Sequence, residues 1–371
     1  MIMNKCNFFF CLLAVFYISC SNDISRNLID VNLDARLPLE TLNDYLSIDS
    51  IIPISSDEYD MFHFDKIIRH DSDIYVLDKT QQAVFKVNTS SKSLKRIVNF
   101  RGAAKNEYIS ITDFAVDERN NIYVFDSDSR KINQYDEEGK FLRSIKVAYG
   151  TSIALSKENE IAINSNQLED NQITVYSPTG ELHYSVLPNS QLPKYALDDI
   201  GSITSQEDKS IYTTPFDFNI YQADKNSNAS LALLDFGKYQ FDVKDLEGID
   251  YQKYQKLLLD NNDKVMLLDH ISAYKKLIFL STDRYDQLVY DKERNIVDAL
   301  SNVEVPYNIL FATPLSVNAN GQFCTAISNS NMCNGYLPWI EKNGTKLPRP
   351  MSMASKEKKN NTFWLLMGSV K

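Results

Sequence analysis

The sequence has few of the residues from which common catalytic and metal-binding motifs are built. Only 4 of its 371 residues are histidine, and none of these forms a His-x-x-x-His or His-Glu-x-x-His pair. The sequence therefore contains no zinc motif. It also lacks a Gly-x-Ser-x-Gly nucleophile elbow and a glycine-rich phosphate loop. A serine nucleophile stays open at this point, because a catalytic triad is assembled in space and not along the chain.

Clusters of positive charge are missing as well. Asp and Glu (49) outnumber Lys and Arg (39), and the formal net charge is −10. Phosphate binding needs concentrated Lys and Arg, so this composition argues against a nucleic-acid partner. The apolar run from Phe8 to Ile18 is also too short for a membrane-spanning helix, which needs ~20 apolar residues.

The N-terminal residues have the organisation of an export signal. Lys5 precedes the apolar run, as in secretory signal peptides. The segment Tyr17-Ile18-Ser19-Cys20 resembles a bacterial lipobox, in which the cysteine becomes the lipidated first residue of the mature chain. We therefore predict a signal peptide over residues 1–19, a lipid on Cys20 and a polar tether over residues 20–28. The acyl chains would anchor the protein in the cell envelope, on the periplasmic or the surface side of the outer membrane.

The few cysteines fit an exported chain. Cys6 and Cys11 leave with the signal peptide, and Cys20 takes the lipid. Cys324 and Cys333 remain, and an even remainder in an exported protein is compatible with a disulfide. The alternative is two unrelated buried thiols.

A repeated strand pattern indicates the fold. Ile122-Tyr-Val-Phe-Asp126 repeats Ile74-Tyr-Val-Leu-Asp78 at an offset of 48 residues, and the same offset pairs Asp65 with Asp113. Both copies are apolar on both faces, whereas a strand with one face in water alternates apolar and polar residues. Strands covered on both sides occur in propeller blades, which pack between two neighbours. We predict an all-β fold, a β-propeller with six blades of four antiparallel strands.

Drifted copies continue to a last strand at residues 362–367, so residues 29–371 are expected to form a single propeller domain. Two segments depart from the repeat. Residues 243–275 have the apolar spacing of a helix and predict a small helical insertion. Residues 334–359 contain prolines and a Lys-Glu-Lys-Lys run, which predict a long loop.

The order of these features resembles a known family. The lipobox is followed by the Ile-Tyr-Val-x-Asp copies, which resemble NHL-type repeats, and then by Phe100-Arg-Gly-Ala-Ala-Lys-Asn-Glu-Tyr108. The last segment looks like a degenerate form of the Gly-x-Gly-Pro-Gly-Glu-Tyr loop of six-bladed β-propeller lipoproteins from gut Bacteroidetes. Ala104, Lys105 and Asn106 replace its later Gly-Pro-Gly. The resemblance implies a six-bladed propeller and a cell-envelope location, but no particular activity.

Candidate contact residues occur in two segments. Trp339 and Tyr336 flank a proline, and a Trp in such a segment can stack on a sugar or anchor a protein partner. The alternative is that Trp339 packs on the last blade. Arg101 and Tyr108, between the first two repeat copies, are the second candidate pair. They could instead hold the shape of their loop.

Asp78 and Asp126 end equivalent strands and could belong to a ring of Ca²⁺ ligands around the channel. The later copies have Asn164, Thr214 and Ser281 at this position, which would remove the charge from such a ring. Hydrogen bonding to the turn that follows is therefore the favoured interpretation. We expect no metal site and no cofactor, with Ca²⁺ as the alternative.

These observations predict a cell-envelope lipoprotein whose propeller binds a glycan or an envelope protein and has no visible catalytic set. One alternative is a propeller hydrolase or lyase with a carboxylate or Ca²⁺-dependent site at the central channel. Enzymatic activity therefore stays open, although its absence is favoured. A further alternative is a purely structural subunit of a larger complex.

Overall fold

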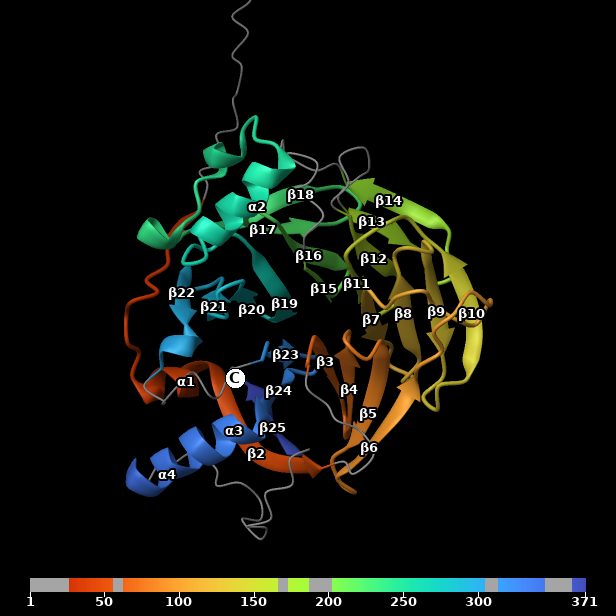
Figure 1. Ribbon diagram of the computed structural model, residues 1–371, viewed down its shortest axis with the longest axis horizontal. Coiled ribbons are helices and arrows are strands. Elements are labelled where there is room, and N and C mark those ends of the chain that lie inside the picture. The colour runs from red at the N-terminus through yellow and green to blue at the C-terminus, as the bar shows by residue number, and fades with distance from the viewer. Residues whose placement is uncertain (1–26, 56–62, 166–172, 187–201, 304–312, 344–361) are drawn as a thin grey trace, which may run out of the picture.

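A computed structural model of the protein describes residues 27–55, 63–165, 173–186, 202–303, 313–343 and 362–371. Six antiparallel sheets of four strands, one of them extended by a fifth strand, stand in a ring around a central axis (Figure 1). This is a six-bladed β-propeller, which confirms the predicted fold class. The predicted signal peptide, Cys20 and the tether up to residue 26 lie outside the described residues.

Each blade runs from an inner strand at the channel to an outer strand at the rim. Blade 1 consists of β3 (Lys66–His70), β4 (Asp73–Asp78), β5 (Ala83–Asn88) and β6 (Ser93–Val98). Blade 2 consists of β7 (Asp113–Val116), β8 (Ile122–Asp126), β9 (Lys131–Tyr135) and β10 (Phe141–Lys146). Blade 3 consists of β11 (Ser152–Leu155), β12 (Ile161–Asn164), β13 (Ile173–Tyr176) and β14 (Leu182–Val186). Blade 4 consists of β15 (Ile203–Gln206), β16 (Lys209–Thr214), β17 (Asp217–Ala223) and β18 (Asn228–Asp235). Blade 5 consists of β19 (Leu268–Tyr274), β20 (Leu277–Thr282), β21 (Gln287–Asp291) and β22 (Ile296–Ala299). Blade 6 consists of β23 (Ser316–Val317), β24 (Gln322–Ser328), β25 (Thr362–Val370) and β2 (Leu46–Ser55).

Antiparallel order places the start of every inner strand and the end of every second strand on one face of the ring. We call this the mouth face. The opposite face, where each inner strand turns into the second strand, is called the turn face.

Strands from both ends of the chain close the ring. β2 pairs along its length with β25, so blade 6 combines the N-terminal and the C-terminal parts of the chain. β1 (Leu28–Asp30) extends the rim of blade 4 by pairing in parallel with β18. The chain then crosses the rim of blade 5, where Leu37 and Val303 form an isolated parallel β-bridge. It continues into α1 (Leu39–Tyr45), which precedes β2. A hydrogen-bonded sheet therefore holds the first and last parts of the ring together.

The second strands are the most deeply buried parts of the blades, as the sequence pattern predicted. All residues of β8 and β20 are buried. In β4, Ile74 and Val76 pack against blade 6, whereas Tyr75 and Leu77 pack against blade 2. Their apolar character on both faces thus follows from their position between two neighbouring sheets.

The low glycine content is compatible with many turns because other residues adopt the left-handed backbone conformation. Asp71, Asn120 and Asn159 have φ values of 52°, 62° and 62° in turns on the turn face. Asp and Asn tolerate this conformation better than most residues. Gly139 is required for a further reason: its φ is 84°, and a Cβ would stand 1.9 Å from the carbonyl oxygen of Ile97.

The helical insertion is shorter than the sequence predicted. η2 (Gly237–Tyr239), η3 (Val243–Leu246) and α2 (Tyr251–Asp260) connect blades 4 and 5. The Asp250 carboxylate accepts from the amide of Lys253 and so caps the start of α2, and Asn261 caps its end. Residues 268–274 belong to β19, because they pair with β20 inside blade 5. A further short helix, η4 (Leu300–Asn302), follows β22.

The segment predicted as a long loop begins as a helix. α3 (Asn329–Asn331), η6 (Met332–Tyr336) and α4 (Leu337–Asn343) follow β24. Met332, Tyr336 and Ile340 recur every four residues and pack into the core of blade 6. Pro338 lies inside this continuous helical segment, directly after the π-helical turn η6, and its missing N–H interrupts the hydrogen-bond ladder there. Residues 344–359 of the predicted loop lie outside the described part of the chain.

Candidate functional site

The central channel opens on the mouth face into a cavity of about 90 Å³. Residues at the starts of all six inner strands line it: β3, β7, β11, β15, β19 and β23. Pockets that enclose a drug-sized ligand have volumes of roughly 300–1,000 Å³. The cavity therefore suits one end of a larger molecule and not a whole oligomer.

Long connections in the described part of the chain run on the mouth face: residues 99–112 join blades 1 and 2, and residues 236–267 join blades 4 and 5. The connections on the turn face have only two to five residues. Because functional residues concentrate on loops that a rigid scaffold positions, the mouth face is the candidate functional face.

An ion pair in the channel links three blades. The Lys66 ammonium lies 2.9 and 2.8 Å from the two carboxylate oxygens of Asp113. The same carboxylate accepts from the amides of Phe114 and Ile153, each at 2.8 Å. The Asp113 side chain is 8% exposed and that of Lys66 is 28% exposed. These four bonds fill the acceptor positions of the carboxylate, so the pair is suited to holding β3, β7 and β11 together.

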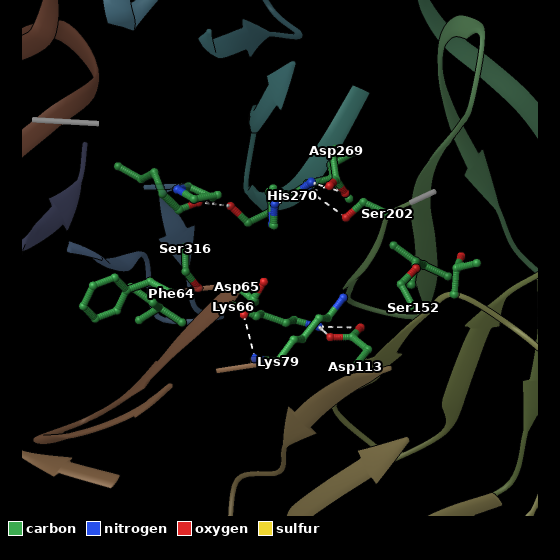
Figure 2. Close-up of a pocket in the computed structure, with 17 residues that line it drawn as sticks. Phe64, Asp65, Lys66, Lys79, Asp113, Ser152, Ser202, Asp269, His270 and Ser316 are labelled. Atoms are coloured by element: carbon green, nitrogen blue, oxygen red, sulfur yellow. Dashed lines mark hydrogen bonds and ion pairs between the residues drawn. The ribbon is translucent and has the colours of Figure 1, made fainter. Parts of the chain in front are cut away.

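Asp269 and His270 form the opposite wall of the cavity (Figure 2). The ring nitrogen Nε2 of His270 lies 3.3 Å from the carboxylate oxygen Oδ2 of Asp269. Ser202 of the neighbouring blade accepts from the amide of Ile271 at 3.0 Å, and Ser272 donates to the carbonyl oxygen of Leu315 at 3.3 Å. Polar links therefore join blades 4, 5 and 6 at this level of the channel.

Other side chains at the mouth have hydrogen-bonding capacity to spare. The Asp65 carboxylate accepts from the amide of Lys79 at 2.7 Å. The Lys79 side chain extends into the cavity (Figure 2), and no residue in the described part of the chain pairs with its ammonium group. Ser316 adds a hydroxyl group, and Phe64 adds an apolar surface whose ring centroid is 5.0 Å from that of Phe363. The arrangement can hydrogen-bond a polar ligand through both donors and acceptors.

The predicted residues Arg101 and Tyr108 lie in one loop but have different environments. Tyr108 is fully buried and donates through its hydroxyl to the carbonyl oxygen of Gln82 at 2.6 Å, and burial raises its pKa. Its position in the core corrects the prediction that Tyr108 contacts a ligand. Arg101 is exposed and donates to the carbonyl oxygen of Ile109 at 3.1 Å. Only Arg101 of this pair presents its side chain to solvent.

The predicted residues Tyr336 and Trp339 lie on the helical segment that follows the second strand of blade 6. Tyr336 is fully buried in the core, where burial raises its pKa, which corrects the prediction of a ligand contact. Trp339 is partly buried against the same core. The two predicted pairs come from different blades, and the cavity is lined by neither.

Asp78 and Asp126 serve the turns that follow their strands. Asp78 accepts from the amide and the side chain of Gln81, both at 2.8 Å. Asp126 accepts from the amide of Ser129 at 3.0 Å and from that of Ile109 at 2.8 Å. Both side chains are fully buried, in agreement with the favoured structural interpretation.

Cys324 and Cys333 are free thiols, which corrects the predicted disulfide; Cys324 is buried as in the alternative, whereas Cys333 is only partly buried. Cys324 lies in the middle of β24 and is buried among the apolar residues that face blade 1. Cys333 lies beyond the end of that strand, in η6, and its thiol faces the side chain of Asn329 at 3.4 Å. The two side chains therefore belong to different surroundings.

Among the described residues, no group of three or more His, Cys, Asp or Glu side chains is close enough together to hold a metal ion. The same part of the chain contains no helix with the length and apolarity needed to cross a membrane.

Sequence reasoning missed most of the cavity residues, although one signal pointed to them. Asp65 and Asp113 share the 48-residue repeat offset, and both stand at the start of an inner strand and line the cavity. Lys66, Lys79 and His270 carried no comparable signal, because their proximity depends on the closure of the ring.

Comparisons with known proteins agree with this architecture. A family model described as a domain of unknown function, DUF4934, matches residues 55–362. A Bacteroides fragilis protein provisionally named as exported has a similar structure, with a TM-score of 0.67 and 16% identity over 93% of this chain and 99% of that one. A member of the DUF4221 family from Bacteroides vulgatus has a TM-score of 0.56 and 10% identity, over 89% and 99% of the two chains. No curated protein matches the sequence. At these identities the two structures share the fold, and the lipoprotein and NHL-like parts of the expected family remain predictions.

Proposed function

The chain belongs to the DUF4934 family, whose description assigns no function, and on that premise we propose that it is an exported, lipid-anchored propeller that binds a glycan at the mouth of its channel. The observation that carries the proposal is the set of polar side chains among the residues that line the cavity. All six inner strands contribute to it, and it includes carboxylates, ammonium groups and hydroxyl groups. Such a set matches the hydroxyl groups of a sugar, which donate and accept at the same time.

The position of the N-terminal strand supports anchoring on the side away from the mouth. Asn27 exchanges hydrogen bonds at 3.0 and 3.2 Å with Asn295, which lies in the turn between β21 and β22 on the turn face. A lipid on Cys20 is seven residues from Asn27, a reach of at most ~25 Å. Tethering there would place the turn face nearer to the membrane and leave the mouth open to ligands. The similarity to a Bacteroides fragilis protein named as exported supports the export part of the proposal.

Glycan-array screening followed by calorimetry on residues 21–371 would test the proposal. We expect binding by the wild-type protein and weaker binding by Lys79→Ala, because Lys79 extends into the cavity. Lys225→Ala is the matched control, since Lys225 is an exposed lysine in a turn-face connection of blade 4. Equal loss in both variants, or no binding to any glycan, would refute a glycan site at the mouth.

A protein partner is the second candidate function, and the loop at residues 99–112 favours it. Phe100 and Ile109 are 39% and 49% exposed beside Arg101. The loop is held rigidly, since the carbonyl oxygen of Glu107 accepts from the side chains of Lys131 and Asn133 at 2.6 and 2.8 Å. Exposed apolar groups next to an arginine are typical of protein interfaces. Capture of one defined envelope protein that is lost in Arg101→Ala would favour this function over glycan binding.

The hydrolase or lyase alternative would use the same mouth. Chemical change of a bound glycan during the binding assay would favour it, and recovery of the intact glycan would favour the binding module.

A further inference from the structure

His270 has an unusual backbone conformation at the wall of the channel. Its φ is 49°, whereas every other described non-glycine residue with a positive φ lies in a turn between two strands. This conformation is disfavoured for a residue with a Cβ. It persists only where the surrounding structure holds it, and such positions concentrate at ligand sites.

A β-bulge in the inner strand of blade 5 causes this conformation. The pairing of β19 with β20 shifts register between Asp269 and Ser272, so the residues between them stand outside the regular ladder. The amide of His270 donates to the Asp269 carboxylate at 2.7 Å, and the amide of Ile271 donates to the hydroxyl of Ser202 at 3.0 Å. The bulge is therefore held by its own strand and by blade 4. Bulges re-aim a side chain, and here the His270 side chain lines the cavity and is 33% exposed.

The groups left to meet a ligand are balanced between donors and acceptors. The charges of Lys66 and Asp113 cancel, and the Asp113 carboxylate already accepts four hydrogen bonds, so this pair offers a ligand no free acceptor. Asp65 and Asp269 remain as acceptors and Lys79 as a donor, while the imidazole of His270 can act as either. With His270 neutral, the charged groups of the cavity sum to −1.

This balance selects the charge of the ligand. An anionic ligand would be repelled by Asp65 and Asp269. A cationic ligand would be attracted by these two carboxylates but repelled by the ammonium of Lys79, so it would gain from only part of the site. A neutral molecule with neighbouring hydroxyl groups satisfies both kinds of side chain, because each hydroxyl donates to a carboxylate and accepts from an ammonium or imidazole group. Phe64 offers an apolar surface to the C–H face of such a molecule.

We propose that the cavity takes the terminal residue of a neutral glycan and that His270 is the residue that determines this specificity. The inference rests on the proposed function, since it names the ligand class of the same site. Asp269 holds the bulge through the amide of His270 and is a positioning residue as well as an acceptor. Lys79 and Asp65 complete the recognition of the hydroxyl groups from blade 1.

Calorimetry with three matched disaccharide panels tests the charge of the ligand. The panels end in glucose, glucuronic acid or glucosamine and have identical second residues. We expect the wild-type protein to bind the neutral panel at least about tenfold more tightly than the other two, a difference of the size that one charge-assisted hydrogen bond supplies.

His270→Gly tests the residue itself. Glycine accepts the positive φ without strain, so this variant should be at least as thermally stable as the wild type while it loses the imidazole. We expect binding of the neutral panel to weaken about tenfold. Asn159→Gly is the matched control, because Asn159 has a φ of 62° in a turn on the opposite face. It should be about as stable as the wild type, because Asn already tolerates this conformation, and it should bind like the wild type.

The outcomes separate the two proposals. Failure of every glycan to bind the wild-type protein would overturn the proposed function, and this inference with it. Binding of glycans with a preference for the acidic or amino panel, or unchanged binding by His270→Gly, would overturn the inference alone. Preference for the neutral panel, lost in His270→Gly and kept in Asn159→Gly, would support it.

Discussion

Removal of the Asp113 side chain tests whether the channel ion pair holds the inner strands together. In Asp113→Ala, the Lys66 ammonium loses both carboxylate contacts, and the amides of Phe114 and Ile153 lose their acceptor. Breaking a buried ion pair from one side costs about 3–5 kcal/mol. Because Lys66 is 28% exposed and water can reach it in part, we take the lower end, about 3 kcal/mol.

Asp113→Asn should cost less, about 1–2 kcal/mol, because its amide oxygen can still accept from a backbone amide. In the double variant Lys66→Met with Asp113→Leu, both charges are replaced by apolar groups. It should therefore be closer to the wild type than Asp113→Ala is, since no unpaired charge remains.

Urea unfolding at pH 7 measures these differences, with the slope expected to stay unchanged. Asp208→Ala, in an exposed turn between β15 and β16, is the control and should stay within about 0.5 kcal/mol of the wild type. A cost below about 1 kcal/mol for Asp113→Ala would refute the reasoning, because the pair would then contribute no more than an exposed one.

Three further outcomes follow from particular residues. Cys20→Ala should abolish partition of the expressed protein into a detergent phase, whereas the wild type should enter that phase if Cys20 carries acyl chains; equal partition of the two proteins would exclude the lipid. Burial raises the pKa of Asp283 above its ordinary value of 3.8, so the folded state keeps a proton that the unfolded state has released, and the contribution of this group to stability should fall as the pH rises upward from about 4. Asp283→Asn should remove this contribution, so the variant should gain stability relative to the wild type between pH 4 and pH 7, and an unchanged difference between the two proteins would contradict the assignment. Gly139→Ala should lower the free energy of unfolding by about 2 kcal/mol or more, because the new Cβ would meet the carbonyl oxygen of Ile97 at a position with φ 84°. Gly237→Ala, with φ 54° and nothing within 4 Å of the added Cβ, should cost only the backbone strain of about 1 kcal/mol in the same urea assay.

The strand pattern predicted the architecture because local burial is encoded residue by residue. Ile74 to Leu77 are apolar on both faces since two different blades cover them, and that requirement is visible in a single strand. The turn function of Asp78 was predictable for the same reason, because its partner Gln81 is three residues away. Predictions that depended on residues near in sequence were the most successful.

The predicted contact residues show where this reasoning stops. Tyr108 follows the polar residues Asn106 and Glu107 of a loop, and nothing in its neighbourhood along the chain distinguishes a surface position from a core position. For Tyr336, the four-residue spacing with Met332 and Ile340 was a local signal of a helix, but the loop prediction did not use it. Tyr108 is buried among the apolar residues of blades 1 and 2, and its hydroxyl donates to the carbonyl oxygen of Gln82. Tyr336 is buried because its segment is helical and packs on blade 6. Both outcomes depend on elements that are distant in the sequence.

The sequence by itself determined a six-fold repeat of strands with two buried faces, because periodicity and apolar pattern are properties of short segments. Only the tertiary structure decided which residues line the mouth of the channel. Lys66 meets Asp113 of the next blade, and the His270 bulge is held by Ser202 of another. Ring closure brings these side chains together from blades that are separated by up to two hundred residues of chain, and no local pattern carries that information.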